Sequence, residues 1–127
     1  MALKTIDGIL LKDMIASGAA LLEKNRQAVD QLNVFPVPDG DTGTNMSQTM
    51  NSAVREMNSR DLVMAGEILQ AVARGALKGA RGNSGVILSQ ILRGFAKASE
   101  GCYFPICGIP FFFRRFSPAA NLMNIFE

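Results

Sequence analysis

Apolar residues recur every three or four positions along most of the chain, which is the spacing of one face of an α-helix. A first face over the N-terminal residues consists of Ile6, Leu10, Met14, Gly18 and Leu21. A second, short helix is predicted over residues 25–32. Pro36 and Pro38 then prevent a helix and favour extended backbone at the residues before them.

Three longer helices follow the proline-rich segment. One begins near Thr42 or Thr44, one spans about residues 64–80, and one spans about residues 84–98. Their apolar stripes comprise Met46, Met50, Val54 and Met57, then Leu69, Val72 and Ala76, then Ile87, Ile91, Leu92 and Phe95. No alternation with a period of two appears before Gly101, so the sequence predicts an all-α domain over residues 1–101.

The pattern changes after Gly101. Seven of the nine aromatic residues and three of the five prolines fall within residues 102–127, where charged residues are scarce and the helical period is lost. One interpretation is a hydrophobic arm that packs against the domain. The other, which composition favours, is an irregular aromatic tail that is not native to the domain.

Composition excludes several functional classes. The 127 residues allow one small domain or part of a larger one, and 48% of them are hydrophobic. A net charge of +2 gives no reason to expect nucleic acid as a partner, and the absence of histidine excludes His-based catalysis. Two late cysteines do not form a disulfide framework, so we expect a reducing, cytoplasmic setting. We expect no targeting segment and no membrane span.

Residues 33–46, "NVFPVPDGDTGTNM", place Asp39 and Asp41 two positions apart on a tight turn. An EF-hand is excluded, because the glycine and glutamate that its loop requires are missing at the corresponding positions. Paired carboxylates on one turn suit a magnesium ion whose other ligands are phosphate oxygens. Asn33 offers a further side-chain oxygen. The alternative is a plain turn followed by an N-capping residue.

A second glycine-rich stretch, "GARGNSG" at residues 79–85, directly precedes a predicted helix. Glycines allow a close approach to the backbone, and the N-terminus of a helix attracts anions. The stretch is neither a Walker A loop nor a dinucleotide-binding fingerprint. It is either a connection between helices capped by Ser84 or a phosphate-binding element. Together with the acidic turn, it favours binding of a magnesium–nucleotide complex.

These two motifs, with "LNVFPVPDGDTGTNM" followed by "GARGNSGVILSQILRGF", resemble the DhaL-type nucleotide-binding domain of dihydroxyacetone kinases. The similarity runs from about Ile6 to about Gly101 and is greatest to the N-terminal, ATP-binding domain of bacterial fatty acid kinase. The resemblance implies an antiparallel barrel of eight α-helices. It also implies two Mg²⁺ ions that bridge the phosphates of ADP or ATP.

The resemblance further implies roles for individual residues. Asp39 and Asp41 would be metal ligands, and Asn33 stands near the place of a third aspartate in the dihydroxyacetone kinases. Contacts to the nucleotide would come from Thr42, Thr44, Asn45, Ser84 and Gly85. No residue is assigned as a catalytic acid, base or nucleophile.

The implied activity is transfer of a phosphoryl group to a small acceptor. That acceptor would be a fatty acid carboxylate on a separate lipid-carrying protein, or dihydroxyacetone. Because the family domain is longer than residues 1–101, we expect this chain to correspond to its N-terminal half and to be inactive alone. The alternatives are a non-catalytic nucleotide-binding or regulatory module, and an inactive fragment.

Overall fold

The computed structural model describes residues 5–35, 37–100 and 106–107. In these residues helices dominate, which confirms the all-α prediction. The elements are β1 (Thr5–Ile6), α1 (Gly8–Lys24), α2 (Arg26–Gln31), α3 (Thr42–Asn58), α4 (Ala65–Lys78), α5 (Gly82–Ala98) and β2 (Ile106–Cys107).

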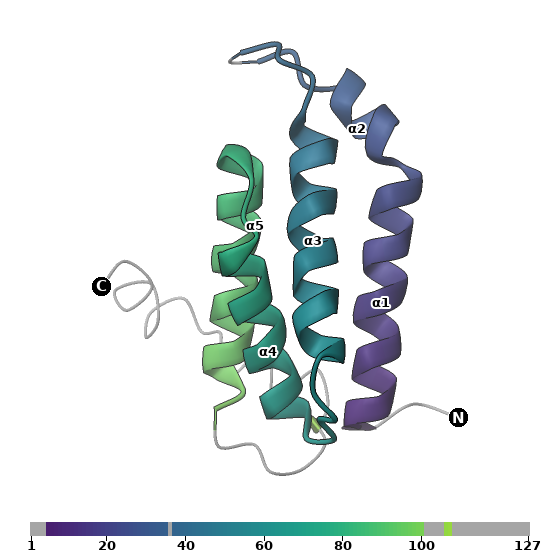
Figure 1. The fold of residues 1–127 in the computed structure, drawn as a ribbon, viewed down its shortest axis with the longest axis vertical. Helices are drawn as coiled ribbons and strands as arrows, with labels where there is room; N and C mark the ends of the chain where they lie inside the picture. The colour runs from purple at the N-terminus through teal and green to yellow at the C-terminus, as the bar shows by residue number, and fades with distance from the viewer. Residues whose placement is uncertain (1–4, 36, 101–105, 108–127) are drawn as a thin grey trace.

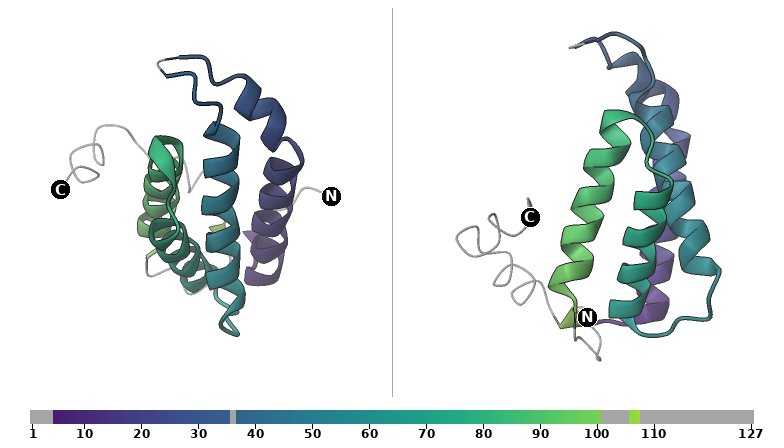
Figure 2. Two further views of the ribbon diagram at one scale, coloured as in Figure 1. Left: turned by 45° about the horizontal axis from the view of Figure 1, so that its top comes forward. Right: turned by 60° about the vertical axis from the view of Figure 1, so that its left-hand side comes forward.

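The four long helices lie side by side and alternate in direction (Figure 1). In that view α1 and α4 run upwards, whereas α3 and α5 run downwards. Helix α3 is central, because it contacts each of the other four helices. The two further views in Figure 2 show the same neighbours, with α4 and α5 adjacent along their lengths. The starts of α3 and α5 therefore lie at the same end of the bundle.

The core lies mainly between α3 and α4. Met57, Ile68 and Val72 are its largest fully buried side chains. The inward positions predicted for α4, namely Leu69, Val72 and Ala76, are all buried, so that prediction is confirmed.

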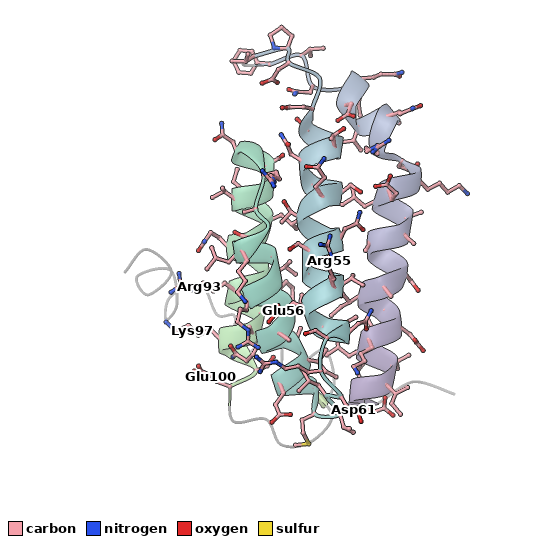
Figure 3. The ribbon with its side chains drawn as sticks, viewed as in Figure 1. Arg55, Glu56, Asp61, Arg93, Lys97 and Glu100 are labelled. Carbon is pink, nitrogen blue, oxygen red and sulfur yellow. The ribbon has the colours of Figure 1, made fainter. Side chains whose placement is uncertain are left out.

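Small residues allow α3 and α4 to approach closely. A Cβ atom added to Gly75 would lie 2.8 Å from the carbonyl oxygen of Ser52, so any larger residue there would push the helices apart. On the exposed side of this contact, Glu56 pairs with Arg74 at 3.2 Å and with Lys78 at 3.7 Å. Figure 3 shows Glu56 on α3, beside α4.

Helix α1 begins at a capped end, because the Asp7 carboxylate accepts a hydrogen bond from the Leu10 N–H at 2.8 Å. The apolar face predicted for this helix is not its buried face. Met14 and Leu21 are 49% and 62% exposed, whereas Leu11 and Ala19 are buried. The helix carries two overlapping apolar stripes, and only packing against α3 and α4 selects the buried one.

Helix α5 begins at Gly82, two residues before the predicted start. Gly82 has a φ of 60°, a conformation that glycine adopts without steric cost. Two apolar residues predicted for this helix, Ile87 and Ile91, are exposed at 61% and 53%. Contact with α4 includes a hydrogen bond of 3.1 Å from the Gln70 side-chain amide to the Ala96 carbonyl oxygen.

The segment 102–127, predicted to be irregular, contains one described element. Ile106–Cys107 forms an antiparallel pair with Thr5–Ile6. The rest of that prediction lies outside the described residues. The eight-helix barrel also extends beyond the helices described and stays a prediction. None of the helices described has both the length and the apolar character needed to cross a membrane.

Candidate functional site

The acidic loop joins α2 to α3 at one end of the bundle (Figure 1). Asn33 lies just beyond the end of α2, and its side-chain Nδ2 donates a hydrogen bond of 2.8 Å to Oδ1 of Asp39. Gly40 follows with a φ of 65°, which allows the chain to turn sharply between the two aspartates. The loop therefore brings together Asn33 and Asp39, two of the three predicted metal ligands.

Asp41 occupies the N-cap position of α3, but its side chain makes no capping hydrogen bond. The first turn of α3 is instead capped from α2. The Asp30 carboxylate accepts hydrogen bonds from the Thr44 N–H at 2.8 Å and from the Thr44 hydroxyl at 2.7 Å. The Asp41 carboxylate therefore does not cap the start of α3.

Asp30 was not among the residues singled out from sequence. It precedes Thr44 by 14 positions and lies on a different helix, so no local spacing rule connects the two. The hydroxyl of Thr44, and next its N–H, lower the pKa of Asp30 below its ordinary value, because both stabilise the ionised carboxylate. The ionised form of the Asp30 carboxyl group is therefore favoured over the protonated form.

The glycine-rich stretch packs directly against the first turns of α3. Ser84 Oγ donates a hydrogen bond of 3.3 Å to the carbonyl oxygen of Thr42. The N–H of Arg81 donates to Thr49 Oγ1 at 3.2 Å. The two motifs are some 40 residues apart in sequence, and the reversal through α4 brings them together.

Glycines make this contact possible. A Cβ atom on Gly82 would collide with the side-chain amide of Asn45, and one on Gly85 would collide with the hydroxyl of Thr49. Gly85 is buried. It is therefore needed for the packing of α5 on α3, whether or not a ligand approaches it.

Ser84 is not the cap of α5. Arg81 occupies the N-cap position without a side-chain hydrogen bond, and Ser84 lies inside the first turn of the helix. The interpretation of Ser84 as a capping serine is therefore wrong. The first N–H groups of α5 have no side-chain acceptor at the cap, which is the condition for binding an external anion.

The oxygen donors in the loop suit a hard cation such as Mg²⁺. Asn33 donates its amide N–H to Asp39, and no hydrogen bond among the described residues uses its side-chain oxygen, so that oxygen can act as a ligand. Within the described residues, ion pairs join Glu23 with Arg26 and Glu56 with Arg74 and Lys78, so they do not neutralise the loop carboxylates.

Protein carboxylates alone do not complete a metal site here. Among the residues described, no group of three or more His, Cys, Asp or Glu is placed to hold a metal ion. An ion at the loop would therefore draw on amide, hydroxyl, water or phosphate oxygens for its other ligands, which is common for Mg²⁺.

An open surface depression of about 690 Å³ lies elsewhere, on the far half of α3. It is lined by Asn51, Val54, Arg55, Asn58 and Ser59, and none of these belongs to either motif. Its position gives no support for a ligand at the acidic loop.

The sequence that carries the two motifs matches a known protein family. The family model for the DAK2 domain matches residues 36–104, which are more than half of the chain. The match includes the glycine-rich stretch and the acidic motif from residue 36 onwards, whereas Asn33 precedes it. The chain belongs to the DAK2 domain family. Family membership confirms the resemblance to the DhaL-type, nucleotide-binding domain of dihydroxyacetone kinases. The similarity to bacterial fatty acid kinase stays a prediction.

Similar proteins occur in Bacillus and Staphylococcus species. Protein YloV of Bacillus subtilis is 54% identical over 100 residues, which cover 79% of this chain and 18% of YloV. An uncharacterized protein of Staphylococcus epidermidis is 53% identical over 96 residues, covering 76% of this chain and 17% of the relative. A third, uncharacterized protein, of Staphylococcus aureus, is 54% identical over 95 residues, covering 75% and 17%. The DAK2 chain thus spans less than a fifth of the length of these relatives.

Proposed function

We propose that this DAK2 domain binds a magnesium–ATP complex and serves a kinase that transfers a phosphoryl group to a small acceptor. The observation that carries the proposal is the contact between the two motifs, made by Ser84 with Thr42. The hydrogen bond from Arg81 to Thr49, in the second turn of α3, supports it. An acidic, oxygen-rich loop thereby lies beside an uncapped helix N-terminus. The first suits a cation and the second suits phosphate, so one ligand containing both can engage them together.

The cation side of the proposed site consists of Asp39, Asp41 and Asn33. Asn33 orients the Asp39 carboxylate through its amide hydrogen bond. When bound, Mg²⁺ ions, two by the family resemblance, would neutralise the negative charge that accumulates on the β- and γ-phosphates during transfer. The loop residues hold and orient; none acts as an acid or base in this proposal.

The phosphate side consists of the start of α5 with Ser84 and Gly85, and of Thr42 and Asn45 on α3. Asn45 lies against Gly82, so its side chain is at the junction of the two helices. Ser84 joins α5 to α3 through its bond to Thr42, and in this proposal it exchanges that bond for one to a phosphate oxygen. Catalysis of phosphoryl transfer depends mainly on such positioning and on electrostatics.

The acceptor is proposed from the family resemblance alone. It is a fatty acid carboxylate presented by a lipid-carrying protein, or dihydroxyacetone. Either acceptor needs a surface beside the γ-phosphate that we do not assign to particular residues.

Calorimetric titration with Mg-ATP and with ATP in the presence of EDTA tests the binding step. We expect saturable binding that requires Mg²⁺. No binding under either condition would refute the proposal. Release of ADP, measured with and without a fatty acid and its carrier, then separates a kinase from a nucleotide-binding module without turnover.

A further inference from the structure

Asp30 caps the start of α3 from outside that helix. It accepts hydrogen bonds from the N–H and the hydroxyl of Thr44, the third residue of α3. The Gly43 N–H also helps to lower the pKa of this carboxyl group. These N–H groups are among those that an N-capping side chain would otherwise satisfy. A negative charge of the protein itself therefore already occupies the anion-binding position at the start of α3.

The start of α5 differs in this respect. Its N-cap residue, Arg81, supplies no side-chain acceptor. The N-termini of α3 and α5 both lie at the proposed site, and the Asp30 carboxylate already binds the one of α3. A phosphate that approaches the α3 start would meet like charge, whereas the α5 start keeps its N–H donors for a ligand.

The hydrogen bonds also limit what Thr44 can do. A threonine hydroxyl has one hydrogen to donate and two lone pairs to accept with. In this structure the hydrogen points to Asp30, and the N–H of the same residue is also bound there. Thr44 therefore has no donor left for a phosphate oxygen, and only its oxygen lone pairs stay open to a ligand.

We propose that Asp30 is a positioning residue of the site, which turns the Thr44 hydroxyl so that its oxygen faces cations and which directs phosphate to the start of α5. The inference rests on the proposed binding of a magnesium–nucleotide complex. It changes the role implied for Thr44 by the family resemblance, from a phosphate contact to a contact on the cation side.

The first test is titration calorimetry with Mg-ADP on the full chain, at limiting and at saturating Mg²⁺. In Asp30→Asn one of the two acceptor oxygens becomes an amide NH₂ group, which cannot accept, so Thr44 keeps at most one of its two hydrogen bonds to this side chain. We expect affinity to fall about tenfold at limiting Mg²⁺, the size of one lost hydrogen bond to a charged group. Saturating Mg²⁺ should recover most of that loss.

Asp61→Asn is the matched control. It removes the same charge at an exposed position at the opposite end of the bundle from the acidic loop (Figure 3). We expect it to bind Mg-ADP like the parent chain. Equal losses in both variants would mean that net charge, rather than the position of Asp30, controls affinity, and would overturn the inference.

Substitutions of Thr44 provide a second test, which does not require Asp30→Asn to fold. Thr44→Ser keeps the hydroxyl and should bind like the parent. Thr44→Val keeps the N–H bond to Asp30 but loses the oxygen, so it should need more Mg²⁺ for the same affinity. Adding Asp30→Asn to Thr44→Val should cost less than Asp30→Asn costs in the parent, because Asp30 acts through the hydroxyl that is already gone.

The outcomes separate this inference from the proposed function. If the parent binds no Mg-ADP, both are wrong. If the parent binds, and Asp30→Asn and Thr44→Val keep its affinity and its dependence on Mg²⁺, only the positioning role is wrong. If Asp30→Asn loses affinity for Mg-ADP and saturating Mg²⁺ does not restore it, Asp30 does not position Thr44 as a cation ligand, and the inference is wrong.

Discussion

Asn33 and Asp30 order the acidic loop from its two sides. Asn33 holds Asp39 within the loop, and Asp30 holds Thr44 where the loop enters α3. Asp41 lies between Asp39 and Thr44 in the sequence, and its side chain makes no capping hydrogen bond to α3. Its carboxylate is therefore the one most available to a ligand.

Replacing either loop carboxylate should therefore weaken nucleotide binding with little effect on folding. We expect Asp39→Asn or Asp41→Asn to weaken Mg-ADP binding by about tenfold or more, since each removes a charged ligand. Far-UV circular dichroism should match the parent, because neither side chain is part of the core. Asp13→Asn, at an exposed position on α1, is the control. Parental affinity in both loop variants would refute the metal assignment.

The contribution of Asp30 to stability should depend on pH. Its pKa is lowered in the folded protein, chiefly by the Thr44 hydroxyl. The folded state then binds fewer protons than the unfolded state at acidic pH. Asp30 should therefore stabilise the fold above its ordinary pKa of 3.8, and this contribution should be lost as pH falls through the lowered value.

Thermal melts of the parent and Asp30→Asn over neutral to acidic pH measure this effect. Near neutral pH we expect the parent to have a higher melting temperature than Asp30→Asn. The difference between the two melting temperatures should become smaller as the pH falls. Asp61→Asn corrects for the loss of one negative charge. A difference in melting temperature that stays constant down to the lowest pH at which both chains fold would contradict the prediction.

At the scale of elements, glycines decide how closely helices approach. Gly85 is buried where α5 crosses the hydroxyl of Thr49, and Gly18 on α1 faces open space. Packing therefore requires a glycine in α5 but not in α1. At Gly85 the helix needs the absence of a side chain, and at Gly18 it does not.

Alanine at the two positions should therefore change stability in opposite directions. Gly85→Ala should destabilise the fold by about 1–3 kcal/mol, as overpacking of a close contact does. Gly18→Ala should stabilise it by about 0.5–1 kcal/mol, because alanine lowers the entropy of the unfolded chain and favours helix. Urea denaturation gives both values. Stabilisation by Gly85→Ala would show that α5 can move away from α3 without cost.

Sequence predicted the helices well, because their spacing is a local property. It placed α4 within a residue or two and identified its buried side. It did not select the buried stripe of α1, since that choice depends on which neighbours pack against it. It also missed Asp30, because its contact with Thr44 forms only when α2 folds against α3.

At the scale of the whole molecule, apolar side chains stay exposed along α5. Ile87 and Ile91 are one helical turn apart, so they form a stripe on its surface. Stripes of this kind promote association in water. Among the described residues, similar exposure occurs at Ile9 and Leu21 on α1.

We therefore expect the purified chain to self-associate in a concentration-dependent manner. Sedimentation velocity should show a smaller average mass for the double variant Ile87→Gln/Ile91→Gln than for the parent. Arg93→Gln, which changes a polar residue on the outer side of α5 (Figure 3), should leave the distribution unchanged. A parent that stays monomeric at high concentration would contradict this expectation.

The return of the chain through α4 also determines where this domain tolerates changes in length. Its 14 residues rise about 21 Å, enough to carry the backbone from one end of the bundle back to the start of α3. Residues 79–81, which follow α4, hold α5 directly against Thr49. Residues 59–64 turn at the opposite end, far from both motifs (Figure 1). Inserted residues should therefore be tolerated in the 59–64 connection, whereas even one added after Lys78 would displace Ser84 from Thr42 and separate the two halves of the site.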